Sequence, residues 1–173
     1  MDEKTVTIFG TSRAKAGDST FALALETGRL LALAGFTIAN GGYGGTMLAA
    51  AKGAAEAGGQ IVGVTCSIFK SATANEYVSR QIVTDSLDER LDTLIELGQA
   101  YIALPGGTGT LLELAKVWEL RNKGFLKPDK PIILVGEFWK PLVELIGIDD
   151  SESSRYVELA DDPQQAVEMI NHD

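Results

Sequence analysis

The feature that most constrains the fold is a turn rich in glycine and hydroxyl residues that recurs after short apolar runs. Such turns lie at 10–12, 40–46 and 105–110, and each leads into a segment with helical composition. Short β-branched runs alternating with helical segments predict right-handed βαβ units and a parallel sheet. Because the runs are apolar throughout, helices are expected on both faces of that sheet. The sequence therefore predicts an α/β fold.

The predicted elements form one domain, residues 1–173, a length that buries roughly 70% of the surface of the unfolded chain. Strands are expected at 6–9, 36–39, 60–65, 82–83, 100–104, 131–135 and near 156–159. Helices are expected at 21–33, 47–57, from a capping box at 86–89 to about 97, at 110–122, around 138–145 and from 163 onward. The stretch 66–80 lacks periodicity and predicts a long surface loop, a candidate lid.

The charge of the chain argues against a nucleic-acid partner. There are 15 Lys and Arg residues against 24 Asp and Glu, a formal net charge of −9, and an acidic domain repels a phosphate backbone. Eight acidic residues and a single arginine fall within 149–173. The rest of the chain is nearly balanced, so a small phosphorylated ligand is compatible with it.

The scarcity of metal-binding residues and the hydropathy pattern exclude further classes of protein. Cys66 is the single cysteine and His172 the single histidine, so neither an intramolecular disulfide nor a His/Cys metal site is expected. No run of about 18 apolar residues exists, and the N-terminus leads directly into a strand pattern rather than a signal peptide. The expectation is a cytoplasmic protein with no membrane partner and no metal.

The glycine-rich turns favour anion binding. A strand-to-helix turn of this kind points backbone N–H groups at a ligand, and the helix dipole adds favourable potential. The turn at 40–46 is neither a Walker A loop nor a GxGxxG fingerprint. The alternative is a tight turn that only packs the next helix against the sheet.

Two charged residues are candidates for chemistry, each with a structural alternative. Glu113 lies in the first turn of a predicted helix at the same sheet edge, but Thr110 and Glu113 also form a capping-box pattern. Arg90 lies in the first turn of its own helix, where a cation opposes the dipole by about 0.3–1 kcal/mol. Either the side chain of Arg90 is exposed to solvent, or the function of the protein requires an arginine at this position.

The segment Pro-Gly-Gly-Thr-Gly-Thr-Leu-Leu-Glu at 105–113 resembles the PGGxGTxxE signature of the LONELY GUY (LOG) phosphoribohydrolases, long labelled possible lysine decarboxylases. Arg90 stands fifteen residues before Pro105, as the family's catalytic arginine does, and 40–48 is similar to the family's GGGxxGxMG loop. The resemblance extends over roughly 5–135. It implies a Rossmann-like parallel sheet with helices on both faces, and a homodimer.

The resemblance also implies an activity, the metal-independent hydrolysis of a nucleoside 5′-monophosphate to free base and ribose 5-phosphate, without a cofactor. Glu113 would be the catalytic carboxylate and Arg90 its partner, and Ser12 would face the nucleotide. The residues expected to contact the phosphate and ribose are Gly41, Gly42, Gly45, Thr46, Gly106, Gly107, Thr108, Gly109 and Thr110. The chain departs from the family's pattern at Asn40, at Leu48 and at 87–88, which bears on the base more than on the fold.

Two rival functions make different demands on the same residues. A nucleotide or molybdenum-cofactor carrier, or a sensor, would use the same turns without turnover. Lysine decarboxylation is rejected because a pyridoxal-phosphate enzyme needs a Schiff-base lysine in its site, and the nine lysines lie mostly in helices or loops away from the glycine turns. A further open question is whether four large apolar residues are core or dimer interface, namely Trp118, Leu120, Phe125 and Trp139.

Overall fold

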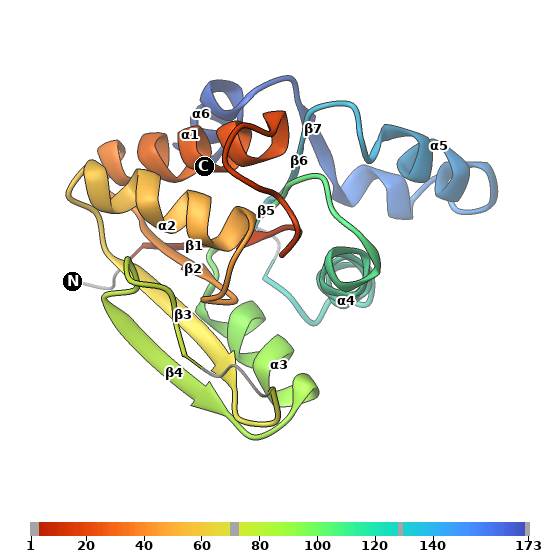
Figure 1. Ribbon diagram of the computed structural model, residues 1–173. Coiled ribbons are helices and arrows are strands. Elements are labelled where there is room, and N and C mark those ends of the chain that lie inside the picture. The colour runs from red at the N-terminus through yellow and green to blue at the C-terminus, as the bar shows by residue number, and fades with distance from the viewer. Residues whose placement is uncertain (1–3, 70–72, 128–129, 172–173) are drawn as a thin grey trace.

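A single seven-stranded parallel sheet organises the chain (Figure 1). The computed structural model describes residues 4–69, 73–127 and 130–171. The strand order is β4-β3-β2-β1-β5-β6-β7. The strands are β1 (Thr5–Phe9), β2 (Thr37–Asn40), β3 (Ile61–Cys66), β4 (Arg80–Thr84), β5 (Ala100–Ala103), β6 (Ile132–Val135) and β7 (Glu158–Ala160). This confirms the predicted α/β fold, and the strand order reverses its direction of growth between β1 and β5.

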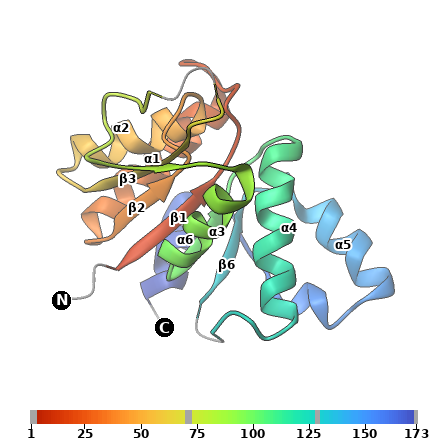
Figure 2. The same ribbon diagram turned by 90° about the horizontal axis from the view of Figure 1, so that it is seen from below.

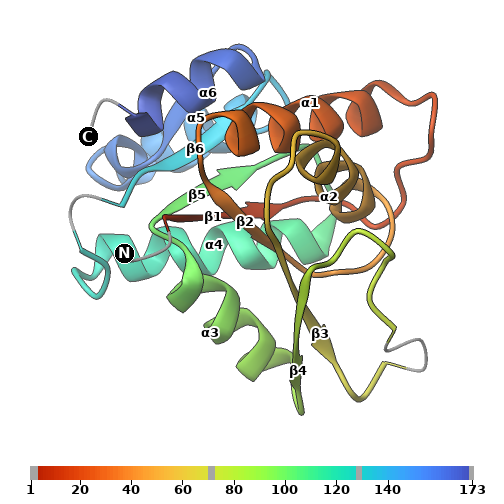
Figure 3. The same ribbon diagram turned by 90° about the vertical axis from the view of Figure 1, so that its left-hand side faces the viewer.

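Helices cover both faces of the sheet (Figures 2 and 3). One face carries α1 (Ser19–Leu33), α2 (Thr46–Glu56) and α6 (Pro163–Asn171). The other carries α3 (Leu87–Leu97), α4 (Thr108–Asn122) and α5 (Lys140–Asp149), with a short 3₁₀ helix at Ser153–Tyr156. The apolar side chains of β1 alternate between the faces, with Val6 and Ile8 in one core and Phe9 in the other.

The helices α1 and α2 pack so closely that glycine is required between them. A Cβ at Gly28 would lie 2.0 Å from the carbonyl oxygen of Ala50, and a Cβ at Gly53 would lie 2.0 Å from that of Leu25. Glycine inside a helix costs roughly 0.5–1 kcal/mol relative to alanine. Part of the glycine excess of this chain therefore serves backbone-to-backbone packing rather than ligand binding.

Some predicted boundaries were wrong, and the reasons are local. The edge strand β4 includes Arg80 and Gln81, whose exposed polar side chains hide the strand from a hydropathy pattern. Helix α5 begins later than predicted, at Lys140 with Pro141 in its first turn. Tyr156 belongs to the 3₁₀ helix, and β7 begins after it. Residues 70–72 of the predicted loop and His172 lie outside the described residues.

The four large apolar residues that could belong to the core or to a dimer interface do not share one environment. Trp118 and Trp139 are core residues, and their indole N–H groups donate to the carbonyl oxygens of Ser153 (2.8 Å) and Leu104 (3.0 Å). Leu120 is partly buried against the same core. Phe125 is 77% exposed, so the core interpretation is wrong for this residue. Within the described ranges, no helix combines the length and the hydropathy that crossing a membrane requires.

Candidate active site

A cavity of about 950 Å³ opens at the carboxyl edge of the sheet, where the turns after β1 and β5 lie side by side. Parallel sheets bind ligands at this edge, at the point where the strand order reverses. Five separate segments contribute its walls. Their lining residues are Gly10, Thr11, Ser12, Arg13, Tyr43, Met47, Phe69, Leu87, Arg90, Gly107, Thr108, Gly109, Thr110 and Glu113.

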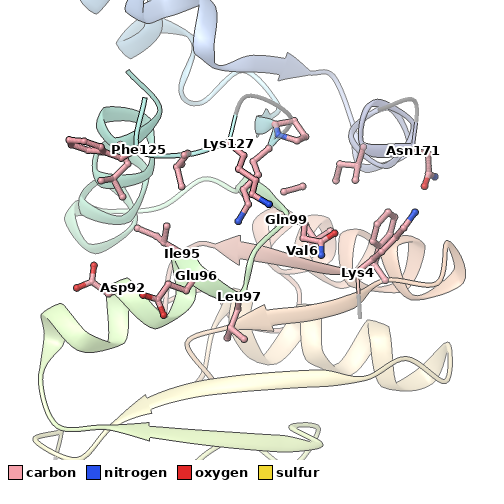
Figure 4. Close-up of a pocket in the computed structure, with 17 residues that line it drawn as sticks. Lys4, Val6, Asp92, Ile95, Glu96, Leu97, Gln99, Phe125, Lys127 and Asn171 are labelled. Carbon is pink, nitrogen blue, oxygen red and sulfur yellow. The ribbon is translucent and has the colours of Figure 1, made fainter. Parts of the chain in front are cut away.

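A second cavity of about 830 Å³ lies at the opposite edge of the sheet (Figure 4). Its lining includes Lys4, Gln99 and Pro131, each immediately before a strand. It therefore lies at the amino ends of the strands, where the topology provides no convergent turns. The carboxyl-edge cavity is accordingly the candidate site.

Arg90 is a buried residue of the cavity wall, and two contacts hold its side chain. Its Nε–H donates to the carbonyl oxygen of Val64 at 2.8 Å, and its Cζ lies 5.6 Å from the centroid of the Tyr43 ring. Only 8% of the residue is exposed. The interpretation of Arg90 as a solvated arginine is therefore wrong, because its side chain lies under the sheet edge. The capping box predicted nearby is confirmed on its Ser86 side, since Ser86 Oγ accepts from the Glu89 N–H.

Glu113 faces Arg90 across the floor of the cavity. Its Oε1 lies 3.9 Å from Arg90 Nη1, a distance longer than a hydrogen bond. Arg90 is therefore close to the carboxylate but does not fix its position through a direct hydrogen bond. Burial raises the pKa of Glu113 to about 7, although the positive charge of Arg90 lowers the pKa in part. A carboxyl group that is half-ionised near neutrality is suited to proton transfer at that pH.

The capping interpretation of Glu113 is wrong. Helix α4 begins at Thr108 with Gly107 as its N-cap. Thr110 is therefore the third residue of the helix rather than its cap, and Glu113 lies in the second turn. The carboxylate is not needed to satisfy the helix N-terminus.

The N-terminus of α4 is open toward the cavity. The first N–H groups of a helix have no acceptor within it. A Cβ added at Gly107 or at Gly109 would meet nothing within 4 Å, so a ligand has room to approach the backbone there. The buried hydroxyl of Thr110 has no hydrogen-bond partner among the described residues. Free N–H donors at a helix N-terminus are features that favour an anion.

Of the first glycine-rich turn, residues 40–46, only Tyr43 is among the described residues that line the cavity. Gly41, Gly42, Gly45 and Thr46 do not line the cavity, and neither does Gly106. The N–H of Gly42 donates to Asn40 Oδ1 at 2.8 Å, and the N–H of Thr46 donates to the carbonyl oxygen of Thr11 at 2.8 Å. The donors at these two positions are therefore engaged within the protein.

The absence of a side chain at Gly41 leaves room for the guanidinium group of Arg90. A Cβ at Gly41 would come within 1.9 Å of Arg90 Nη2. In the second turn and after β1, by contrast, Ser12, Gly107, Thr108, Gly109 and Thr110 line the cavity. Of the predicted residues outside the lining, Gly41 packs against Arg90 and Gly45 packs against the turn after β1.

Sequence reasoning missed several lining residues. Tyr43 lies inside the glycine-rich turn, while Arg13, Met47 and Leu87 lie on segments already singled out for other residues. Phe69 follows β3 in the stretch 66–80, for which no periodicity or motif gave a signal. The lining residues within 4–69, 73–127 and 130–171 include no lysine. Among the described residues, no three His, Cys, Asp or Glu side chains come together in a way that could hold a metal.

Comparisons with known proteins agree with this architecture. The family model described as possible lysine decarboxylase matches residues 47–170. The cytokinin riboside 5′-monophosphate phosphoribohydrolase of Mycobacterium tuberculosis is 38% identical over 116 residues, which cover 65% of this chain and 60% of that protein. The protein of the same name from Rhodococcoides fascians is 32% identical over 148 residues, covering 83% and 74%. The structure of the molybdenum cofactor binding protein of Rippkaea orientalis superposes with a TM-score of 0.82 at 24% identity, covering 99% of this chain and 98% of that one.

Proposed function

The chain belongs to the LOG family, the possible lysine decarboxylases, and we propose that it hydrolyses the N-glycosidic bond of nucleoside 5′-monophosphates. The products would be the free base and ribose 5-phosphate. The observation that carries this proposal is the buried pair of Arg90 and Glu113 on the floor of a cavity whose rim holds an open helix N-terminus. Phosphorylated nucleotides are also what the related phosphoribohydrolases named above act on.

The phosphate would bind at the N-terminus of α4. Backbone N–H groups of Thr108 and Gly109 and the unpartnered hydroxyl of Thr110 supply donors there. Arg13 and Ser12, on the turn after β1, lie on the same cavity and extend the donor set. No side chain blocks the approach beside Gly107 and Gly109.

The chemistry balances without any other reactant. Water adds to the anomeric carbon as the bond from that carbon to the base nitrogen breaks, and the electron pair of that bond leaves with the base. Glu113, in its ionised form, stabilises the positive charge that develops on the ribose and accepts the proton of the attacking water. The base nitrogen takes up a proton from solvent, and Glu113 returns the proton of the attacking water to solvent. Arg90 stabilises the negative charge that builds on the leaving base.

Two other activities are less well supported. A carrier or sensor would need the anion site but has no use for a buried carboxyl group whose pKa is about 7 beside an arginine. Lysine decarboxylation through pyridoxal phosphate requires a Schiff-base lysine, and the described residues that line the cavity include none.

A homodimer forms part of the proposal. Leu112 on α4 and Leu145 and Ile148 on α5 are exposed apolar residues of neighbouring helices, which lie together at one side of the molecule (Figure 2). A groove of about 350 Å³ between these helices has Leu111 and Ile146 among its lining residues. A second copy of the chain would cover these side chains.

The test is chromatographic detection of free base after incubation with AMP and other nucleoside monophosphates. The wild-type protein should release base, and Glu113→Gln should lower the rate by ~10²–10⁴-fold while AMP still raises the melting temperature. Glu119→Gln, an exposed glutamate on the same helix, is the matched control and should keep the wild-type rate. Thermal stabilisation by nucleotides without base release from the wild-type protein would favour the carrier function instead.

A further inference from the structure

The cavity at the amino edge of the sheet has no role in the chemistry described so far. Its volume of about 830 Å³ lies within the range of small-molecule pockets, about 300–1,000 Å³. Its walls come from the C-terminal parts of α3, α4 and α6 and from the residues that lead into β1, β2, β5 and β6. None of its lining residues also lines the carboxyl-edge cavity. The two cavities are therefore separate sites.

The inner part of the amino-edge cavity is apolar. Val6, Ile95 and Ala100 are buried residues of its lining, and Leu120 adds a partly buried side chain from the end of α4. Phe125, also in the lining, is 77% exposed. Apolar walls of this kind suit the hydrocarbon part of a ligand, because contact with them removes that part from water.

Three lysines line the same cavity, although the whole chain carries a net charge of −9. The Nζ of Lys130 donates to the carbonyl oxygen of Gly98 at 2.6 Å, which holds that side chain at the end of α3. Lys4 and Lys127 are exposed, and their ammonium groups form no hydrogen bond or ion pair within 4–69, 73–127 and 130–171. Lys127 extends into the cavity (Figure 4).

Two carboxylates face these lysines from α3. Figure 4 shows Asp92 and Glu96 on this helix, across the cavity from Lys127. Asp92 Oδ1 lies 2.5 Å from Lys116 Nζ, so its charge is compensated by a lysine outside the lining. Glu96 is exposed and is the one uncompensated carboxylate among the described lining residues. Three ammonium groups against one such carboxylate give the cavity a local potential that favours an anion.

We propose that the amino-edge cavity is a second ligand site, which binds a small organic carboxylate with an apolar body. The carboxylate pairs with Lys127, and the body lies against Ile95, Leu120 and Phe125. The proposal does not depend on the hydrolysis of nucleotides, because it concerns the opposite edge of the sheet.

The experiment separates the charge of the ligand from its apolar body. Isothermal titration calorimetry compares 2-naphthoate, its uncharged analogue 2-naphthamide, and acetate. Naphthoate should bind with one molecule per chain, and naphthamide should bind at least about fivefold more weakly, because it lacks the charge that pairs with lysine. Acetate should give no measurable binding, because it buries almost no apolar surface. Added salt should weaken the binding of naphthoate but not that of naphthamide.

Variants then place the ligand in the cavity. Lys127→Gln should weaken naphthoate about two- to fivefold and leave naphthamide unchanged. Glu96→Gln removes the facing carboxylate and should strengthen the binding of naphthoate. Phe125→Ser, at an exposed position where the fold tolerates a change, should weaken both compounds. Arg13→Gln is the matched control, because it removes a cation from the carboxyl-edge cavity, and it should change neither affinity.

Opposite effects of Lys127→Gln and Glu96→Gln on naphthoate would support the proposal. Naphthoate that fails to bind, or binds no better than naphthamide, would overturn it. A loss of affinity confined to Arg13→Gln would also overturn it, because the ligand would then occupy the carboxyl-edge cavity. An equal loss in Lys127→Gln and Glu96→Gln would contradict an anion site, since the ligand would then use both charges.

Discussion

The guanidinium group of Arg90 occupies the space where Gly41 would carry a side chain, since an added Cβ would lie 1.9 Å from Nη2. Other contacts of Arg90, to the carbonyl oxygen of Val64 and to the ring of Tyr43, leave it little freedom to move away. The glycine thus determines where the arginine lies, and the arginine determines the electrostatic environment of Glu113.

Replacing Gly41 by alanine should therefore displace Arg90. We expect overpacking to lower the free energy of unfolding by about 1–3 kcal/mol and the misplaced arginine to reduce base release by about 10²-fold. Gly44→Ala is the control, because in the same turn its added Cβ meets only the Ser12 carbonyl oxygen at 3.9 Å. Equal activity of the two variants would show that the position of Arg90 is not limiting.

The rate of base release should depend on pH through Glu113. Its pKa is raised to about 7 by burial, and the ionised form is the one proposed to act. We expect kcat/KM for AMP to rise with pH and to level off above about pH 7. A profile that falls over the same interval would assign Glu113 the role of proton donor instead.

The same group should make the stability of the protein depend on pH. The carboxyl pKa rises from 4.5 to about 7 on folding, so the folded state favours the protonated form. The contribution to stability is fully present below pH 4.5 and is lost as pH rises through about 7, a change of about 3 kcal/mol. Chemical denaturation at pH 5 and pH 8 should show that Glu113→Gln, which stays neutral, gains stability over the wild type at the higher pH. A constant difference between the two proteins would contradict the raised pKa.

The buried hydroxyl of Thr110 should serve ligand binding rather than stability. Thr110→Val removes an unpartnered polar group, so the melting temperature should stay the same or rise, while the affinity for AMP should fall as one phosphate donor is lost. The control is Thr7→Val, because the Thr7 hydroxyl donates to the Leu94 carbonyl at 2.8 Å. Its loss should cost about 1 kcal/mol. Undiminished AMP affinity in Thr110→Val would remove Thr110 from the phosphate site.

The exposed apolar side chains of α5 should hold a dimer together. Sedimentation at micromolar concentration should give about twice the chain mass of 18.4 kDa. Ile148→Glu, at a position that is 83% exposed in the single chain, should yield the single-chain mass without loss of helical signal. If the wild-type protein itself sediments as one chain, the surface has some other role.

The fold was predictable because local signals agreed with the global topology. The central apolar strands, the glycine-rich turns and the cap at Ser86 lie close to where those signals placed them. The Arg90–Glu113 pair was predictable only through the resemblance to a family. Spacing alone favoured a cap for Glu113, and only the actual start of α4 excludes that role.

The remaining site residues depend on packing over long separations in the sequence. Nothing in the composition of 66–80 predicts that Phe69 meets Tyr43, because their contact arises from strand pairing between β2 and β3. In the same way, the glycine at position 41 is explained by a side chain 49 positions further along the chain. Such relationships exist only in the folded structure.

The central place of β1 has a consequence for how the chain acquires its structure. β1 pairs on one side with β2, which follows soon after it, and on the other with β5, which ends at Ala103. During synthesis, one edge of the first strand stays unpaired until more than half of the chain has been made. Non-local pairing of this kind slows folding, and an unpaired strand edge invites association with other chains. The cavity can form only after that pairing, so no N-terminal fragment that stops short of β5 should bind a nucleotide.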